Sequence, residues 1–254
     1  MIWHTFDKAF EANIKAFTTT KQDLPIHLQR AFHDAETPDV KARLWNNIYQ
    51  IIAAELVLDA GNLVFAKQTH SNHVAVIDGT EQHLPVPDTD GLITRLSGKC
   101  LCIQTADCTP ILLVDPMRKV VAALHAGWRG TAQNIAGNAV NLMKKHYQTK
   151  PENIQALIGP CISQQVYEVG LDVYRAFEAI GLVNDGLFIP GKKEGKFYLN
   201  LNLANTQLLL KEGVLLEKIR TQDWCTFQNG GQFYSARRDG GKTGRIITGI
   251  VINK

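Results

Sequence analysis

Three side chains in this sequence have the types needed to bind a transition metal together: His70, Cys108 and His125. Each follows an apolar run typical of a strand, so each is expected at a strand end or in the tight loop beside it. Zinc prefers thiolate and imidazole ligands, and three protein ligands leave a fourth tetrahedral position open for water or substrate. Zinc lowers the pKa of such a water to about 7. The separations of 38 and 17 residues match no local zinc motif, so spacing by itself does not establish the site.

The same cysteine supports a second interpretation, a metal-free cysteine hydrolase. Cys108 would then be the nucleophile, and His125 or His70 would be its general base. Asp107 would orient an imidazole or act as an acid–base group, although a turn or capping role suits an aspartate equally well. The candidate catalytic residues are therefore Cys108, His125 and Asp107.

Two glycine-rich segments are candidates for binding an anion such as phosphate. In His125-Ala-Gly-Trp-Arg-Gly-Thr131 a predicted strand leads into a helix and exposes backbone N–H groups, and Arg129 adds a bidentate donor. The second segment, residues 235–245, contains Arg237 and Arg238, but its order of Gly and Lys is not that of a phosphate P-loop. A plain strand-to-helix turn and a solvated basic loop are the structural alternatives for the two segments.

The elements that would position these residues follow from the apolar spacing. A helix is predicted from Pro38 to Leu56, because apolar side chains recur at four-residue spacing after Thr37, a typical N-cap residue. Further strands are predicted over 63–66, 100–104, 111–114, 120–124, 154–158 and 246–252, and further helices after residue 131, near 169–180 and over 203–211. Residues 184–196 are rich in Gly and Lys and predict a surface loop. No repeat or linker interrupts the pattern, so residues 1–254 are predicted to form one mixed α/β domain.

Composition limits the class of protein and its partners. The 254 residues carry a formal net charge of +3. This small charge excludes a protein whose whole surface is basic and binds a nucleic-acid polymer. Residues 236–254 hold five Lys or Arg side chains and one Asp, so the excess charge is local. Five cysteines without a CxxC pair favour a reducing compartment. No signal peptide is evident and the most apolar long segment contains Glu55 and Asp59, so we expect a cytoplasmic protein that does not span a membrane.

Six short motifs, taken together, resemble those of a known family. They are Lys67-Gln-Thr-His70, Thr105-Ala-Asp-Cys108, His125-Ala-Gly-Trp-Arg-Gly-Thr131, Ile158-Gly-Pro-Cys-Ile162, Tyr167-Glu-Val-Gly170 and the run from Ser235 to Arg245. Their order and content are similar to those of the YfiH/YlmD-like laccase-domain family, also called the multicopper polyphenol oxidase family. The similarity extends from about residue 60 to the end of the chain.

The resemblance implies a fold, a metal and an activity. The fold would be α+β, with mixed β-sheets sandwiched between helix layers in the order α/β/β/α. A zinc ion, or copper in its place, would be bound by His70, Cys108 and His125. The activity would be phosphorolysis of purine nucleosides (adenosine, inosine, guanosine or methylthioadenosine) together with deamination of adenosine. Members of the family are also described as copper-dependent phenol oxidases and as peptidoglycan editing factors, so both remain alternatives.

Chemistry favours the nucleoside activities among these. A laccase needs several copper sites and many histidines, whereas this chain has eight histidines, no His-X-His pair and one obvious cluster. Phosphorolysis needs phosphate below the sugar C1′, and Arg129, Arg237 and Arg238 are the candidate ligands for it by their charge. The expected partners are therefore a purine nucleoside and inorganic phosphate, and a non-catalytic binding protein is a third class to be tested.

The N-terminal segment departs from the family pattern. Members usually have Phe-Thr-Thr-Arg followed by Gly-Gly-Val-Ser, whereas Phe17-Thr-Thr is followed here by Thr20-Lys-Gln-Asp. The expected equivalent of the family's downstream His-Val-Gly-Asp is His33-Asp-Ala-Glu. In the family this region helps to form the nucleoside pocket, so we expect the change to affect substrate preference.

Overall fold

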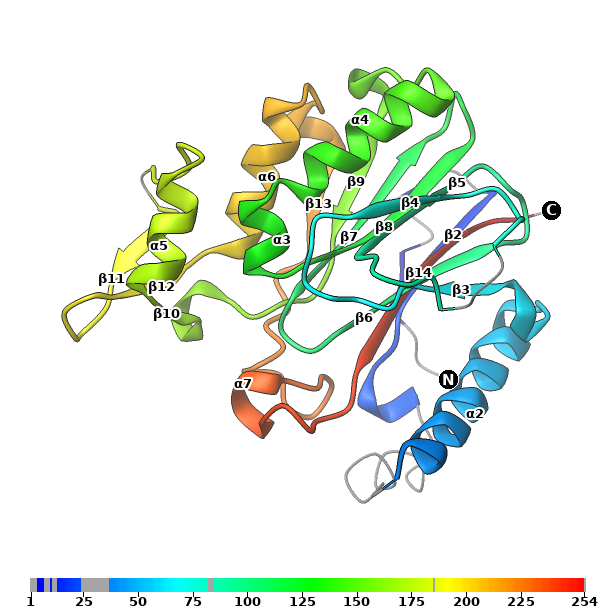
Figure 1. The fold of residues 1–254 in the computed structure, drawn as a ribbon, viewed down its shortest axis with the longest axis horizontal. Coiled ribbons are helices and arrows are strands. Elements are labelled where there is room, and N and C mark those ends of the chain that lie inside the picture. The colour runs from blue at the N-terminus through cyan, green and yellow to red at the C-terminus, as the bar shows by residue number, and fades with distance from the viewer. Residues whose placement is uncertain are drawn as a thin grey trace.

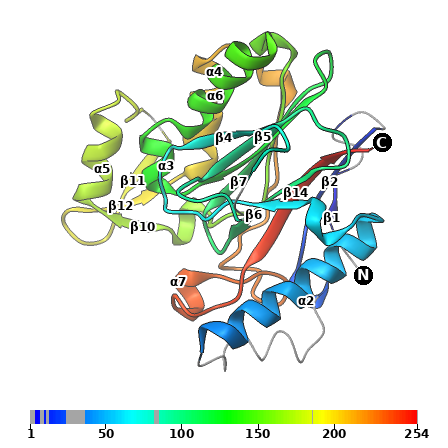
Figure 2. The same cartoon turned by 45° about the vertical axis from the view of Figure 1, so that its right-hand side comes forward.

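Two large β-sheets pack face to face between helices in the computed structural model (Figure 1, Figure 2). The structure describes residues 4–6, 10, 13–23, 37–81, 85–184 and 186–253, so the expected motif at His33 lies outside the described residues. Apolar side chains of both sheets, among them Val64, Leu101, Leu112 and Val121, form a continuous core between them.

The first sheet has five strands and is covered on its outer face by one long helix. Its strands, in spatial order, are β1 (His4–Thr5), β2 (Ile14–Thr18), β14 (Ile246–Ile252), β6 (Cys100–Thr105) and β3 (Leu63–Phe65). Helix α2 (Pro38–Leu56) packs Ile48 and Ile52 against Cys102 and Ile247 of this sheet.

The second sheet has six strands and carries helices on its opposite face. Its order is β13 (Ile219–Thr221), β9 (Gln155–Ile158), β7 (Thr109–Asp115), β8 (Val120–Ala126), β5 (Gly91–Thr94) and β4 (Val74–Ile77). Helices α4 (Ile135–Tyr147) and α6 (Leu201–Lys211) pack on it through a buried cluster that includes Ile135, Met143 and Leu209. The layers therefore run α/β/β/α, and the predicted fold class is confirmed.

A small third sheet and its helix extend from this body on the side of α6 (Figure 1). The sheet consists of β10 (Glu168–Gly170), β12 (Lys196–Leu199) and β11 (Phe188–Pro190), and α5 (Leu171–Glu178) packs on it. The prediction of an uninterrupted loop over 184–196 was wrong, because it contains β11 and the start of β12. The cause is tertiary packing, since Phe188 contacts Tyr174 and Phe177 of α5 with ring centroids 5.0 and 5.5 Å apart.

Local signals explain the boundaries of the helices next to the pocket. Thr37 Oγ1 accepts a hydrogen bond from the Val40 N–H, and α2 begins and ends where the sequence predicts. The helix predicted after residue 131 is preceded by a short one, α3 (Trp128–Ala132). The two are separated by Asn134, which has a left-handed φ of 57° and caps α4 through the Gly137 N–H. The segment 235–245 contains the short helix α7 (Ala236–Asp239).

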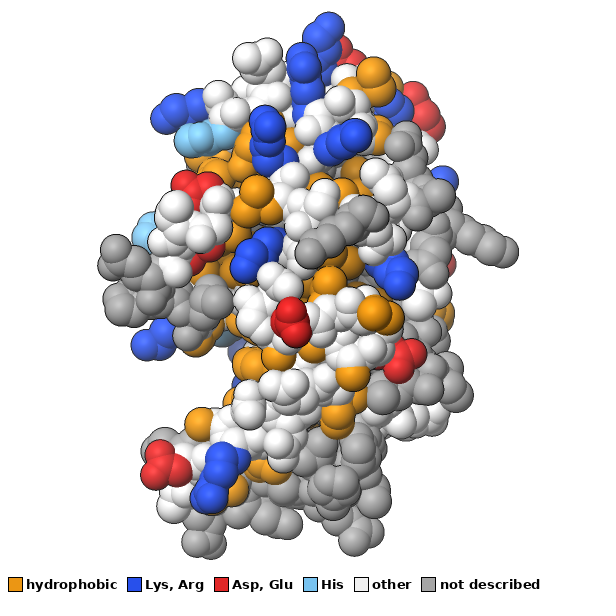
Figure 3. Space-filling view, turned by 90° about the vertical axis from the view of Figure 1, so that its right-hand side faces the viewer, with side chains coloured by type: hydrophobic (Ala, Val, Ile, Leu, Met, Phe, Trp, Pro, Cys, Tyr) orange, Lys and Arg blue, Asp and Glu red, His pale blue; other side chains and the backbone are white. Residues whose placement is uncertain are grey.

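Short 3₁₀ helices complete the described elements; they are Lys21–Asp23, Ala60–Asn62, Pro151–Asn153, Gln164–Val166 and Leu216–Lys218. Within the described residues, no helix combines the length and apolar character required to cross a bilayer. On the face drawn in Figure 3, Lys and Arg side chains are interspersed with Asp and Glu, as expected from the small net charge.

Candidate metal centre and its pocket

The structure brings the three predicted metal ligands together. His70 follows β3, Cys108 lies in the turn between β6 and β7, and His125 is the penultimate residue of β8. One potential ligand atom from each side chain lies within 4.8 Å of those of the other two. The two imidazole rings meet edge to face, with centroids 4.9 Å apart. His70 is exposed, Cys108 is half-buried and His125 is buried, so solvent reaches the cluster on the His70 side.

A buried carboxylate orients two of these ligands. Asp90 Oδ1 accepts a 2.7 Å hydrogen bond from His125 Nδ1, which leaves Nε2 as the nitrogen available to a metal. The same carboxylate accepts the backbone N–H groups of Thr69, His70 and Ser71 at 2.8 to 3.0 Å. His70 has a left-handed φ of 61°, a conformation that a non-glycine residue adopts at a cost. Asp90 therefore fixes both the ring of His125 and the strained turn that presents His70.

The electrostatics of the cluster stabilise a thiolate. Burial opposes ionisation of Cys108, but His125 and His70 outweigh it and lower its pKa to about 6. Burial likewise opposes protonation of His125, yet Cys108 and Asp90 raise its pKa to about 9. Hydrogen bonds from His125 and from the Ser71 and Thr69 groups overcome desolvation and hold the pKa of Asp90 well below its usual range. An anionic sulfur beside two imidazoles is the donor set that zinc prefers.

Gly127 packs directly against two of the ligands, and its lack of a side chain makes room for them. A Cβ at this position would lie 3.0 Å from Cys108 Sγ and 3.2 Å from His70 Cδ2. The glycine in the predicted anion loop thus serves close packing against the ligands, and it also caps α3 with an extended backbone.

Asp107 is placed beside Cys108, but both of its carboxylate oxygens are already engaged. Oδ1 accepts the Thr226 hydroxyl at 2.6 Å, and Oδ2 accepts the backbone N–H of Arg237 at 2.7 Å. Its backbone has a φ of 95°, and its carbonyl accepts the N–H of Ile162. Asp107 thus connects the turn that carries Cys108 to the segment that carries Arg237.

The three arginines predicted to bind phosphate are placed differently. Arg237 lines the pocket, and its guanidinium carbon lies 5.1 Å from the centroid of the Tyr167 ring. Its guanidinium also donates a hydrogen bond to the Glu168 carbonyl. Arg238 is turned into the protein, where it donates to backbone carbonyls, including that of Phe233, and to Asp239.

Arg129 is exposed and stacks on the neighbouring ring of Trp128, with its guanidinium carbon 4.3 Å from the ring centroid. It is not among the described residues that line the pocket. The structure therefore brings one of the three predicted arginines, Arg237, to the pocket of the metal cluster.

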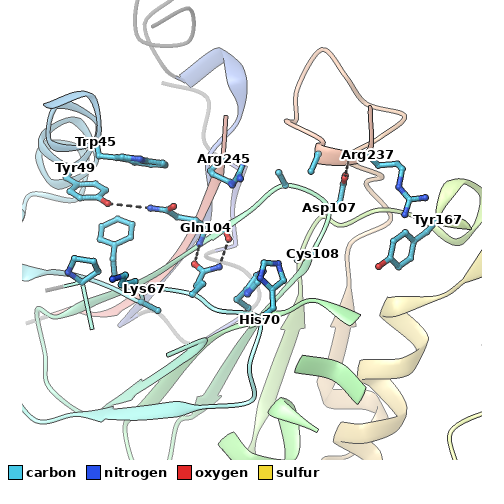
Figure 4. Close-up of a pocket in the computed structure, with 17 residues that line it drawn as sticks. Trp45, Tyr49, Lys67, His70, Gln104, Asp107, Cys108, Tyr167, Arg237 and Arg245 are labelled. Carbon is cyan, nitrogen blue, oxygen red and sulfur yellow. Dashed lines mark hydrogen bonds between the residues drawn. The ribbon is translucent and has the colours of Figure 1, made fainter. Parts of the chain in front are cut away.

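A pocket of about 740 Å³ contains the metal cluster and extends to either side of it (Figure 4). At one end Trp45 and Tyr49 of α2 stand beside Phe65, and the rings of Tyr49 and Phe65 stack with centroids 4.1 Å apart. At the other end are Tyr167 and Arg237. Gln68, Gln104 and Arg245 also line it.

Sequence reasoning did not assign roles to several of these residues. Asp90 precedes the short strand β5 and has no motif that distinguishes it from a turn aspartate. Gln68 and Arg245 belong to motifs quoted above, and the family resemblance was the only signal that could have drawn attention to them. Tyr49 lies on the apolar face of α2, where its spacing predicts a core residue.

Comparison with known proteins identifies the family. The sequence model of the family described as multi-copper polyphenol oxidoreductase laccase matches residues 29–253. The Purine nucleoside phosphorylase of Bacteroides thetaiotaomicron is 38% identical over 199 residues, which are 76% of this chain and 74% of that protein. Adenosine deaminase RL5 from an unknown prokaryotic organism is 38% identical over 206 residues, 78% of each chain.

A solved structure agrees with this assignment. The crystal structure of the hypothetical protein YfiH from Bacillus licheniformis superposes with a TM-score of 0.85 at 31% identity, covering 95% of this chain and 94% of that one. The chain therefore belongs to the multi-copper polyphenol oxidoreductase laccase family.

Proposed function

We propose that this chain is a purine nucleoside enzyme that uses one zinc ion, bound by His70, Cys108 and His125. The observation that carries the proposal is the convergence of a thiol and two imidazoles within 4.8 Å beside a pocket of about 740 Å³. Curated relatives named as a purine nucleoside phosphorylase and an adenosine deaminase support the substrate class.

The residues present fit a single zinc ion. Cys108 supplies a stabilised thiolate, and Asp90 fixes the tautomer of His125, as carboxylates do for metal-bound histidines in general. When bound, zinc would act as a Lewis acid and would lower the pKa of a water molecule. Among the described residues this is the one group of three His, Cys or acidic side chains that could hold a metal, which favours a single-metal reaction over multicopper oxidation.

The two reactions make different demands on the rest of the pocket. Phosphorolysis converts adenosine and phosphate to adenine and ribose 1-phosphate, so a cation must hold the phosphate. Deamination converts adenosine and water to inosine and ammonia without phosphate. Arg237 is the arginine we propose for the phosphate, with Tyr167 and the backbone contact from Asp107 holding it in place.

Asp107 acts in this scheme as a positioning residue. Because its two oxygens already accept hydrogen bonds from Thr226 and Arg237, it connects the metal ligand Cys108 to the phosphate end of the pocket.

Product analysis tests the proposal directly. Purified protein is incubated with adenosine, with and without phosphate, and the products are separated by chromatography. Adenine and ribose 1-phosphate that form only with phosphate indicate phosphorolysis, and inosine that forms without phosphate indicates deamination. Absence of all these products at high enzyme concentration would overturn the proposal.

One observation favours a second candidate, a metal-free cysteine hydrolase acting on an amide or a cell-wall peptide. The pKa of Cys108 is lowered to about 6 beside two imidazoles, as is typical of a cysteine nucleophile. Elemental analysis for zinc and copper separates the candidates. A metal bound in stoichiometric amount and lost in Cys108→Ala supports the first, whereas active protein without metal supports the second.

A further inference from the structure

Gln104 is the penultimate residue of β6, and its side chain contacts Tyr49 of α2, the helix that covers the five-stranded sheet. Gln104 pairs with Ile247 across β6 and β14, and Ile247 packs in the apolar layer under α2. Gln104 is half-buried and lines the pocket together with Tyr49 and Trp45 of α2 (Figure 4). Gln104 therefore places a polar amide in the pocket wall, next to the apolar cluster under α2.

Two neighbours hold this residue in place. The side-chain amide of Gln68 engages the Gln104 backbone at both ends, since Gln68 Nε2 donates to the Gln104 carbonyl and Gln68 Oε1 accepts from the Gln104 N–H, each at 2.7 Å. The side-chain Nε2 of Gln104 donates to Tyr49 Oη at 3.4 Å. The ring of Tyr49 is itself held by stacking on Phe65. Gln68 therefore holds the Gln104 backbone, and Tyr49 holds its side-chain amide at the pocket wall.

The remaining hydrogen-bonding groups of this amide are available to a ligand. Within the described part of the chain, Gln104 Oε1 and the second Nε2 hydrogen have no hydrogen-bond partner. An amide thus offers the pocket one acceptor and one donor side by side.

We propose that Gln104 is a specificity-determining residue that reads the edge of the purine ring formed by N1 and the 6-substituent. The inference rests on the proposed function. In adenine, N6 donates and N1 accepts, whereas in hypoxanthine N1 donates and O6 accepts. Each edge carries one donor beside one acceptor, in opposite order. A glutamine amide therefore forms two hydrogen bonds with either base if it turns by about 180° between them, and Tyr49 Oη permits both orientations because a hydroxyl can donate as well as accept.

The distribution of side chains along the pocket supports this placement of the base. The flat apolar rings of Trp45, Tyr49 and Phe65 lie at the Gln104 end, and aromatic rings stack favourably on a base. Arg237 lies at the opposite end, next to Tyr167. A nucleoside whose base faces α2 would therefore direct its sugar toward the phosphate end.

The test compares Gln104→Met with the wild-type protein on ligands that do and do not have this edge. Methionine retains the length and volume of glutamine but cannot form either hydrogen bond. The expected result is a loss of about 10- to 100-fold in kcat/KM for both adenosine and inosine. The inhibition constant of 1-deazapurine riboside, which has C–H groups in place of N1 and of the 6-substituent, should change less than about twofold, because such a ligand has no bond to lose.

Gln68→Met is a second variant, because Gln68 holds the Gln104 backbone. It should weaken adenosine and inosine less than Gln104→Met does and should likewise leave 1-deazapurine riboside nearly unchanged. The proposal is overturned if Gln104→Met, with unchanged circular dichroism and zinc content, weakens all three ligands equally or none of them. Absence of nucleoside turnover in the wild-type protein would instead overturn the proposed function, so the two failures are distinguishable.

Discussion

The imidazole of His125 donates its Nδ1 hydrogen to the buried carboxylate of Asp90 at 2.7 Å. These residues are 35 positions apart in the sequence and come together because β5 and β8 pair antiparallel, with Gly91 opposite Leu124. The same carboxylate accepts the backbone N–H of His70. One residue therefore presets two of the three ligand positions before a metal binds, which reduces the reorganisation that binding requires.

Replacing Asp90 by Asn should weaken metal binding. The amide cannot accept every hydrogen bond that the carboxylate accepts, and it removes the negative charge that stabilises His125. We expect a loss of about 10- to 100-fold in zinc affinity, measured by competition with a chromophoric chelator. Asp88→Asn is the matched control, because Asp88 is exposed and nearby, and it should bind zinc as the wild type does. Equal affinities for all three proteins would contradict the role of Asp90.

Gly127→Ala tests the close packing behind the ligands. The added Cβ would lie 3.0 Å from Cys108 Sγ, so the sulfur or the helix start has to move. Zinc content and turnover of adenosine should both fall, while Gly231→Ala, whose Cβ meets no atom within 4 Å, should leave both unchanged. A fully active Gly127→Ala protein that binds zinc normally would contradict the need for close packing between residue 127 and the ligands.

Arg237→Ala should separate phosphorolysis from deamination. Because only phosphorolysis uses phosphate, loss of this cation should raise the KM for phosphate by about tenfold or more and leave adenosine deamination within about twofold. Arg129→Ala should affect neither reaction, since Arg129 stacks on Trp128 away from the pocket lining. Steady-state kinetics with varied phosphate give both values. A parallel loss of both activities in Arg237→Ala would contradict a phosphate role.

Removal of the metal should expose one reactive thiol. In protein from which a chelator has removed the metal, the pKa of Cys108 is about 6, whereas burial raises that of Cys161 to about 12. Iodoacetamide at pH 7 should therefore alkylate Cys108 rapidly and Cys161 slowly, because the thiolate is the nucleophile. Since the pKa of Cys108 is lowered, its alkylation rate should be constant well above pH 6 and should fall as the pH decreases through 6. Peptide mass spectrometry locates the label, and preferential labelling of Cys161 would contradict the assignment.

Local signals predicted much of the fold. Thr37 and the apolar spacing after it gave both ends of α2, and the apolar run of β14 was predicted with its observed bounds, Ile246–Ile252. These elements depend on capping and periodicity, which are properties of neighbouring residues. The strand Phe188–Pro190 was missed, because it forms through contacts of Phe188 with α5 and not through its own sequence.

The same division applies to the site. The residue types of His70, Cys108 and His125 suited either a metal site or a cysteine hydrolase, and the family resemblance implied the metal. The proximity of the three side chains is compatible with both. The pairing of Asp90 with His125 and that of Gln68 with Gln104 depend on which strands are adjacent, so no spacing in the sequence indicates them. For Arg129 and Arg238, charge and a nearby glycine loop indicated an anion site, but stacking on Trp128 and donation to the Phe233 carbonyl direct these side chains elsewhere.

The most direct test of the central proposal measures zinc content and adenosine turnover in the same preparations of wild-type and Cys108→Ala protein. The account predicts stoichiometric zinc in the wild type, with adenine and ribose 1-phosphate formed from adenosine and phosphate, and the loss of both zinc and products in Cys108→Ala. Turnover of adenosine by Cys108→Ala at the wild-type rate, or a wild-type protein that is active without any metal, would contradict it.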